Sequence, residues 1–202
     1  MELLSSEISD GLAEIFKLGN QRASEVLTRL LGCPITVNVQ DFYLRNKSQL
    51  SRLVRAEDTT TYFQILQRIS GKMNMDVVYI FSEHPQNAIN SKVEFKHRQN
   101  PFELGREGMS EIGNVIINAY LSSMAQMLEF DLDSSLPSFY LNNPNGILTN
   151  ILSKPEHTSF LMLNTEINIK EQYINGNLIF VLSQTSLNTL EHLLSSFLEC
   201  LI

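Results

Sequence analysis

The sequence is poor in the residue types that build disulfide frameworks and metal sites. Its 202 residues include two cysteines, Cys33 and Cys200, which are too few for a disulfide framework. Each follows an apolar, helix-like run, so we expect thiols that are buried or incidental, without a redox role. The histidines are scattered without the spacing of metal ligands: His84, His97, His157 and His192. The sequence therefore predicts a protein with no metal or cofactor of its own.

Long runs of one chemical kind are also missing. No basic run offsets the formal net charge of −7, which argues against a general nucleic-acid binder. No stretch approaches roughly 18 consecutive apolar residues, and residues 1–7 lack the basic and apolar regions of a secretion signal. No Gly/Ser-rich linker divides the chain. We therefore expect a cytoplasmic protein, without membrane insertion, that forms a single domain over residues 1–202.

Hydrophobic residues make up 43% of the chain, enough to bury a sizeable core. A first long helix is predicted from an N-cap at Ser9 or Asp10 to Leu31, where Gly32 and Pro34 end it. A second long helix is predicted over 102–130. Between them the patterns indicate strand segments at 35–39 and 41–44, a polar connection at 45–58, a hairpin of 59–70 and 75–82 turning at 71–74, and a helix over 85–95.

The second half of the chain repeats the first. Phe139-Tyr-Leu echoes Phe42-Tyr-Leu, and the segments 158–163 and 177–183 echo 60–66 and 76–82 at an offset of about 94 to 101 residues. Asn175-Gly176 predicts a hairpin turn, and the chain closes with a helix over 186–202. The prediction is an α/β (α+β) fold made of two pseudo-repeats, about 1–100 and 101–202, with two long helices on a shared antiparallel sheet.

The second long helix carries a polar ridge. At about 100° per residue, the side chains Glu107, Glu111, Asn114 and Asn118 fall within an arc of roughly 60°, away from the apolar stripe. A carboxylate at i and an amide at i+3 are about 5–6 Å apart at Cβ, so both can enter one pocket on another molecule. The amide can hold a water and the carboxylate can pair with a cation. Periodicity alone favours an ordinary solvated face of an amphipathic helix.

The spacing of this ridge resembles a known signature. Glu111-x2-Asn114, followed after 22 intervening residues by Pro137, resembles the active-site signature of the CheC/CheX/FliY family of chemotaxis phosphatases, Asp/Ser-x3-Glu-x2-Asn-x22-Pro. The first position differs, because Glu107 stands where the family has Asp or Ser. The resemblance implies a CheC-like fold with duplicated halves, each of which presents a long helix with its own candidate site.

The two halves do not carry equal sites. Aligning Leu18-Gly19-Asn20 with Ile112-Gly113-Asn114 puts Lys17 at the position of Glu111. A lysine there would repel a partner cation that a glutamate attracts. We therefore expect one working site and one vestigial site that keeps only Asn20, unless Asn20 merely lies on a solvated helix face.

The resemblance also implies an activity. The family removes the phosphoryl group from the aspartyl phosphate of response regulators such as CheY. Mapped onto this chain, Glu111 would pair with the regulator's active-site lysine, and Asn114 would reach the acyl phosphate and orient a water. Glu107, Asn118 and Pro137 would be accessory, and Mg²⁺ would belong to the regulator.

Two other functions fit the sequence. One is a non-catalytic interaction module that binds a phosphorylated regulator, a CheD-type deamidase or a flagellar switch protein. The other is a purely structural domain whose polar ridge is ordinary surface.

Overall fold

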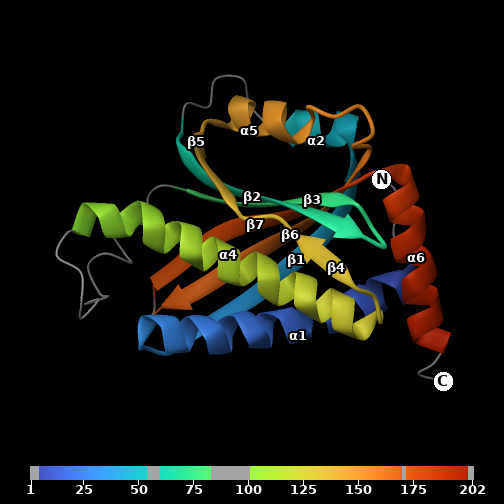
Figure 1. The fold of residues 1–202 in the computed structure, drawn as a ribbon, viewed down its shortest axis with the longest axis horizontal. Coiled ribbons are helices and arrows are strands. Elements are labelled where there is room, and N and C mark those ends of the chain that lie inside the picture. Colours follow the sequence, from blue (N-terminus) through green and yellow to red (C-terminus); the bar gives the residue numbers. More distant parts are fainter. Residues whose placement is uncertain (1–4, 54–59, 83–100, 170–171, 200–202) are drawn as a thin grey trace.

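The computed structural model describes residues 5–53, 60–82, 101–169 and 172–199 (Figure 1). The predicted helix over 85–95 lies outside the described residues, as do His84, His97 and Cys200. In chain order the elements are α1 (Ser6–Leu31), β1 (Ile35–Asn46), α2 (Lys47–Leu53), β2 (Tyr62–Gly71), β3 (Met75–Ser82), α4 (Pro101–Met127), β4 (Leu132–Ser134), β5 (Ser138–Asn142), α5 (Pro144–Ile151), β6 (Ser159–Ile169), β7 (Gln172–Leu182) and α6 (Gln184–Glu199). Within the described residues, no helix has the length and apolar character needed to cross a membrane.

The strands form one sheet of seven strands in the order β1-β6-β7-β3-β2-β4, with β5 also paired to β2. Every pairing in this sheet is antiparallel. The hairpins β2–β3 and β6–β7 meet at the centre through β3 and β7, and β1 flanks one side as β4 and β5 flank the other. The predicted α/β class with an antiparallel sheet is confirmed.

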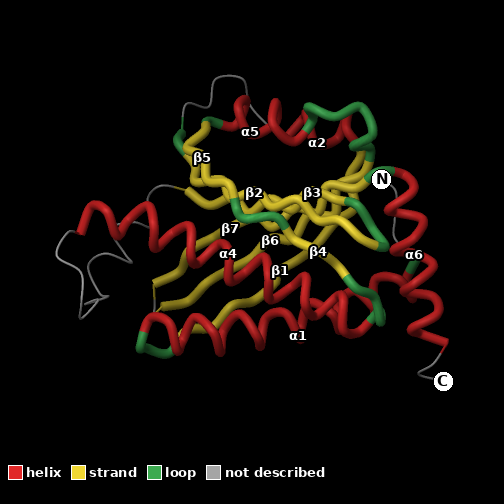
Figure 2. The backbone as a smooth tube through the Cα atoms, in the orientation of Figure 1, coloured by secondary structure: helices red, strands yellow, loops and turns green. Residues whose placement is uncertain are grey.

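Helices cover both faces of the sheet. The long helices α1 and α4 lie side by side on one face, the short helices α2 and α5 cover the other, and α6 stands at one end (Figures 1 and 2). The larger apolar core fills the space between the sheet and the helices α1, α4 and α6. A smaller core lies beneath α2 and α5 and includes Leu50, Ile80, Ile147 and Phe160. The polar ridge of α4 is thus carried by a helix packed on the sheet.

The first helix starts one turn earlier than predicted. Its N-cap is Ser5, whose Oγ accepts a hydrogen bond from the Ile8 N–H at 3.3 Å. The prediction of Ser9 or Asp10 as the cap was wrong, because Ile8 packs against the core and keeps this first turn helical. The predicted end at Leu31 is confirmed: Gly32 follows with φ 67° and closes the helix on Thr28 O.

The second long helix ends at Met127 instead of running to residue 130. Glu129 adopts a left-handed conformation with φ 51°, which ends the helical path. The Phe130 N–H then bonds back to Ala125 O at 3.0 Å. Strand β1 in turn joins the two predicted segments 35–39 and 41–44, with a register irregularity between Val39 and Asp41.

One hairpin turn was predicted correctly and the other was not. The turn at 71–74 is confirmed, since β2 ends at Gly71 and β3 begins at Met75. Asn175 and Gly176, however, lie inside β7 and pair with Glu166 and Thr165. The last pair of this hairpin is instead Ile169 with Gln172.

Gly176 has a packing role that accounts for this error. The Tyr79 hydroxyl and, at 3.1 Å, Thr165 Oγ1 occupy the space that a Cβ at position 176 would need. These two hydroxyls are hydrogen-bonded to each other at 3.0 Å within the buried sheet. The glycine therefore marks a close cross-strand approach and not a turn.

Candidate functional site

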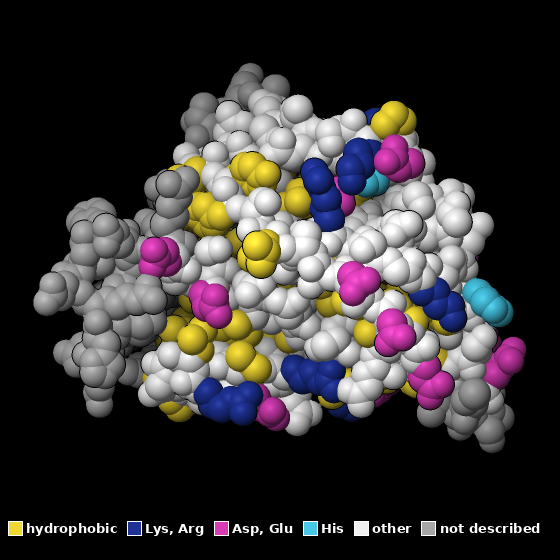
Figure 3. Space-filling model, viewed as in Figure 1, with side chains coloured by type: hydrophobic (Ala, Val, Ile, Leu, Met, Phe, Trp, Pro, Cys, Tyr) yellow, Lys and Arg dark blue, Asp and Glu magenta, His cyan; other side chains and the backbone are white. Residues whose placement is uncertain are grey.

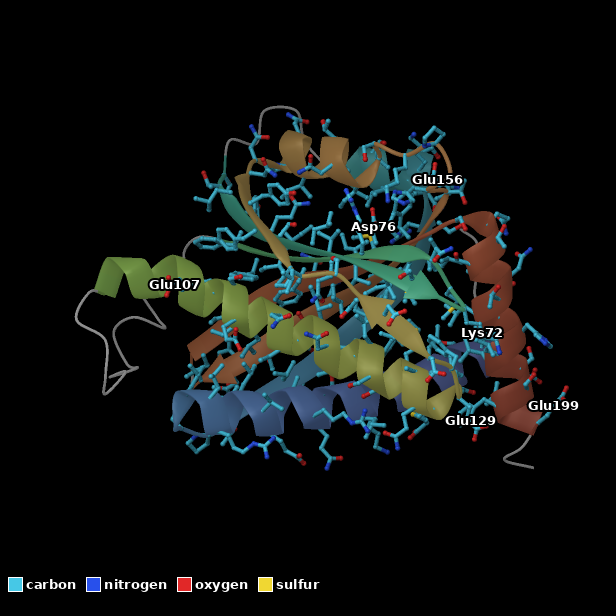
Figure 4. All side chains as sticks on the ribbon, in the orientation of Figure 1. Lys72, Asp76, Glu107, Glu129, Glu156 and Glu199 are labelled. Atoms are coloured by element: carbon cyan, nitrogen blue, oxygen red, sulfur yellow. The ribbon has the colours of Figure 1, made fainter. Side chains whose placement is uncertain are left out.

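The polar ridge of α4 lies on the side of the helix opposite its buried apolar face. The predicted apolar stripe is buried throughout: Met109, Ile112, Ile116, Ile117, Tyr120, Leu121, Met124 and Leu128. The polar residues follow the other side of the helix. Glu107 and Glu111 are exposed there, whereas Asn114 and Asn118 are half-buried. Figure 4 shows the labelled Glu107 toward the N-terminal end of α4.

Gly113 brings this ridge close to strand β2. A Cβ at position 113 would lie 2.5 Å from Ile65 Cδ1 and 2.9 Å from Ile65 Cγ1. Only a residue without a side chain permits this approach, because real Cβ atoms do not come so near to other carbon atoms. The next residue on the helix, Asn114, is thereby placed against β2.

Asn114 contacts β2 through its side-chain oxygen. Asn114 Oδ1 accepts a hydrogen bond from Gln67 Nε2 at 3.1 Å and a second from Asn118 Nδ2 at 2.8 Å. Gln67 is 2% exposed, so its amide is a buried group. Of the four ridge residues, the structure brings Asn114 and Asn118 into direct contact.

The same glutamine reaches the segment that leads to Pro137. Gln67 Nε2 lies 3.5 Å from the main-chain oxygen of Ser135, which stands between β4 and β5. Ser135 is itself fastened to β2, since its N–H donates to Arg68 O at 2.9 Å and its Oγ accepts from the Arg68 N–H at 3.0 Å. One buried amide therefore contacts both Asn114 and the chain two residues before Pro137.

Beyond Ser135 the chain projects apolar side chains toward solvent. Leu136 is 89% exposed, Pro137 is half-buried, and Tyr140 and Leu141 on β5 are exposed. Hydrophobic side chains are visible on this face of the molecule, over α4 and β5 and close to acidic ones (Figure 3). An apolar projection thus adjoins the polar ridge.

In the first half, the corresponding residues Gly19 and Asn20 contact another helix instead of the sheet. Asn20 Oδ1 accepts a hydrogen bond from the Tyr120 hydroxyl at 2.5 Å, and a Cβ at Gly19 would lie 2.6 Å from the Tyr120 ring. Burial raises the pKa of Tyr120 above its ordinary value, and the neighbouring Tyr79 adds to the shift. Asn20 thus joins α1 to α4.

Lys17 lies on the exposed side of α1. Its Nζ is 3.5 Å from Glu14 Oε2, an i,i+3 pair between two largely exposed side chains. Lys17 and Asn20 both line a pocket of about 360 Å³ between α1 and β1. No carboxylate occupies the place of Glu111 in this half, where the sequence puts Lys17.

Gln67 is the site residue that the sequence analysis missed. It lies on the same side of β2 as Phe63, Ile65 and Ile69, which are all buried. A polar residue at an inward position of an alternating strand was the available signal, because such a residue needs a hydrogen-bond partner inside the protein.

No protein-family model matches the sequence, and no curated protein matches it either. Solved structures do match. FliY from Thermotoga maritima is 14% identical, with a TM-score of 0.74 over 98% of this chain and 100% of that one. The FliG–FliM complex from H. pylori contains a chain that is 12% identical, with a TM-score of 0.65 over 93% and 100%. The chemotaxis protein CheX from Desulfovibrio desulfuricans is 11% identical, with a TM-score of 0.51 over 83% and 99%.

These similarities extend over nearly the full length of the matched chains and agree with the motif on α4. The resemblance drawn from Glu111, Asn114 and Pro137 is confirmed at the level of the fold. The chain has the fold of the CheC/CheX/FliY family.

Proposed function

We propose that this protein removes the phosphoryl group from the aspartyl phosphate of a CheY-like response regulator, using Glu111 and Asn114 of α4. The observation that supports this most is the amide of Gln67, which contacts Asn114 Oδ1 at 3.1 Å and Ser135 O at 3.5 Å. Asn114 and the segment that leads to Pro137 therefore both reach the same buried amide. This common contact supports the proposal beyond the spacing of the signature alone.

The residues suit a positioning mechanism. Glu111 is exposed one turn before Asn114, so its carboxylate can pair with the active-site lysine of a docked regulator. Asn114 then enters the regulator's site, where it holds a water in line with the acyl phosphate. Phosphoryl transfer passes through a loose transition state that gains chiefly from alignment and charge stabilisation. An amide that places the water is therefore sufficient, and the mechanism needs no general base.

The other residues take supporting roles in this proposal. Asn118 holds Asn114 from the helix side at 2.8 Å, and the exposed Leu136 with Pro137 offers an apolar contact for the regulator beside the ridge. Glu107 stands at the signature's first position. The Mg²⁺ needed to neutralise the phosphoryl oxygens belongs to the regulator.

The experiment is a phosphate-release assay on a panel of phosphorylated response regulators. The protein should accelerate release from at least one of them. Glu111→Ala should raise KM for that regulator about tenfold or more, because it removes the ion pair that fixes the docked geometry. No acceleration with any regulator would contradict the proposal.

A second candidate is an interaction module that binds a flagellar switch protein, a CheD-like protein or a phosphorylated regulator without chemistry. One observation favours it: the fold is shared with FliM, which forms a complex with FliG in H. pylori. Binding that depends on regulator phosphorylation, with unchanged phosphate loss, would establish this function instead.

A further inference from the structure

The orientation of the Asn114 amide follows from the main-chain oxygen of Ser135, whose position is fixed. Gln67 Nε2 lies between Asn114 Oδ1 and the main-chain oxygen of Ser135. The backbone around Ser135 is fixed by its paired contacts with Arg68, at 2.9 and 3.0 Å. A main-chain carbonyl only accepts hydrogen bonds, so the end of Gln67 that faces it carries the N–H groups.

The reverse orientation of Gln67 is unfavourable at both ends. It would bring Oε1 toward the Ser135 oxygen, where two acceptors face each other. It would also move the amino group to the position now held by Oε1, which is buried without a hydrogen-bond partner among the described residues. A buried amino group would then leave two donors unsatisfied instead of one oxygen.

Asn114 must match the N–H that Gln67 presents. Its Oδ1 therefore points inward, toward Gln67 and toward the second donor, Asn118 Nδ2. The amino group Nδ2 of Asn114 points the other way, and none of the described residues accepts a hydrogen bond from it. Since the side chain is half-buried and lies on the exposed ridge, this end faces outward.

We propose that Gln67 is a positioning residue that holds Asn114 with its amino group toward the docked regulator, so that Asn114 acts as an N–H donor. This inference rests on the proposed function. The donor binds the oxygen of the attacking water, which forms the new bond to phosphorus. The bond from phosphorus to the regulator's aspartyl oxygen breaks, its electron pair stays on the carboxylate, and a water proton passes to the released phosphate.

The orientation is tested without any activity, by NMR of the side-chain amides in the free protein. The Gln67 Nε2 protons should exchange slowly with solvent, and the Asn114 Nδ2 protons should exchange fast. In Gln67→Glu, whose ionised carboxylate only accepts, Asn114 should turn and its Nδ2 protons should become protected. Protected Asn114 Nδ2 protons in the wild type would overturn the inference.

The functional half is tested with Gln67→Met, which keeps the length of the side chain and removes the donor. We expect kcat to fall about tenfold with KM within about twofold, because docking is intact and alignment is lost. The matched control is Gln64→Met, another fully buried glutamine of β2, whose Oε1 accepts from Asn142 and Asn150 on the other side of the sheet. This control should lose stability and keep its kcat.

A pH series separates positioning from simple structural support. In Gln67→Glu the side chain regains a donor when protonated, so activity relative to the wild type should rise as the pH falls. Gln67→Met should show no such rise. Equal pH profiles for the two variants, or a wild-type kcat in Gln67→Met, would overturn the inference.

Failure of the wild type on every regulator, with the NMR result as expected, would instead overturn the proposed function and leave the orientation of Asn114 standing.

Discussion

Gln67 on β2 donates a 3.1 Å hydrogen bond to Asn114 on α4, and this bond ties the helix ridge to the sheet at the point where the β4–β5 connection arrives. Gly113 makes the bond possible, because any side chain there would collide with Ile65. Gly113 and Asn114 therefore act together: the glycine lets α4 approach β2 closely, and this approach puts Asn114 within hydrogen-bond distance of Gln67. In the first half, Gly19 and Asn20 serve the same geometry for a helix–helix contact with Tyr120.

Asn118→Ala should weaken the site less than a change at Asn114 itself. It removes one of the two hydrogen bonds that hold Asn114 Oδ1, while Gln67 keeps the other. We expect kcat for phosphate release to fall roughly threefold, about 0.7 kcal/mol of transition-state stabilisation. Asn38→Ala, at an exposed position of β1, is the control and should behave as the wild type. A loss as large as that of Asn114→Ala would show that Asn118 acts directly.

Gly176→Ala should destabilise the sheet by about 2–3 kcal/mol, because its Cβ collides with the Tyr79 hydroxyl and with Thr165 Oγ1. Urea denaturation measures the loss. Tyr79→Leu removes both the hydroxyl and the ring carbon Cζ, which would lie 2.7 Å from that Cβ, so the double variant Gly176→Ala/Tyr79→Leu should be more stable than the sum of the single changes implies. Additive losses would mean that the clash does not account for the glycine.

Asp76→Ala should cost about 2–3 kcal/mol of stability. This buried carboxylate on β3 binds Lys154 Nζ through both oxygens, at 3.1 and 2.9 Å, and lies 3.7 Å from His157 Nε2. Its removal leaves the Lys154 ammonium without its counter-charge. Asp76 and Glu156 both line a pocket of about 580 Å³, and Figure 4 labels both residues. Glu156→Ala is therefore the matched control, since this carboxylate is exposed. Thermal unfolding should separate the two variants; equal stabilities would refute the role of Asp76.

The protein should lose stability in alkali above about pH 10. Burial raises the pKa of Tyr79 to about 12, although its hydrogen bond with Thr165 opposes the shift, and burial also raises the pKa of Tyr120. Between the unfolded and folded pKa values the unfolded chain releases the proton that the folded one keeps, so stability is complete below pH 10 and falls as the pH rises toward 12. Unfolding monitored with phenolate absorbance should show these tyrosines ionising together with the loss of structure. Ionisation of both in a still-folded protein would contradict their burial.

The fold class and the ridge were accessible from the sequence because they depend on periodicity. The apolar stripe from Met109 to Leu128 and the end of α1 at Gly32 both follow from local rules, and both are confirmed. The hairpin at 71–74 follows in the same way.

The errors arose where tertiary contacts decide the outcome. Gly176 was taken for a turn residue because its real reason, the hydroxyl of Tyr79, belongs to a strand far away in the sequence. The same holds for Gln67, whose partner Asn114 lies 47 residues away. Ser5 was missed as the N-cap because the core contact of Ile8 extends the helix beyond its best local start. The roles of Glu111 and Asn114 in catalysis remain predictions that activity measurements must decide.

The most direct test of the central claim compares Asn114→Ala with Asn20→Ala in phosphate release from a phosphorylated CheY-like regulator. Both changes remove an asparagine that follows a glycine on a long helix. Asn114→Ala takes the acceptor from Gln67 Nε2 and Asn118 Nδ2, and Asn20→Ala takes the acceptor from the Tyr120 hydroxyl. If α4 carries the working site, Asn114→Ala should lose about 100-fold or more of the stimulated rate, and Asn20→Ala should lose stability but keep its rate. Equal losses of rate in the two variants, or full activity in Asn114→Ala, would contradict the account.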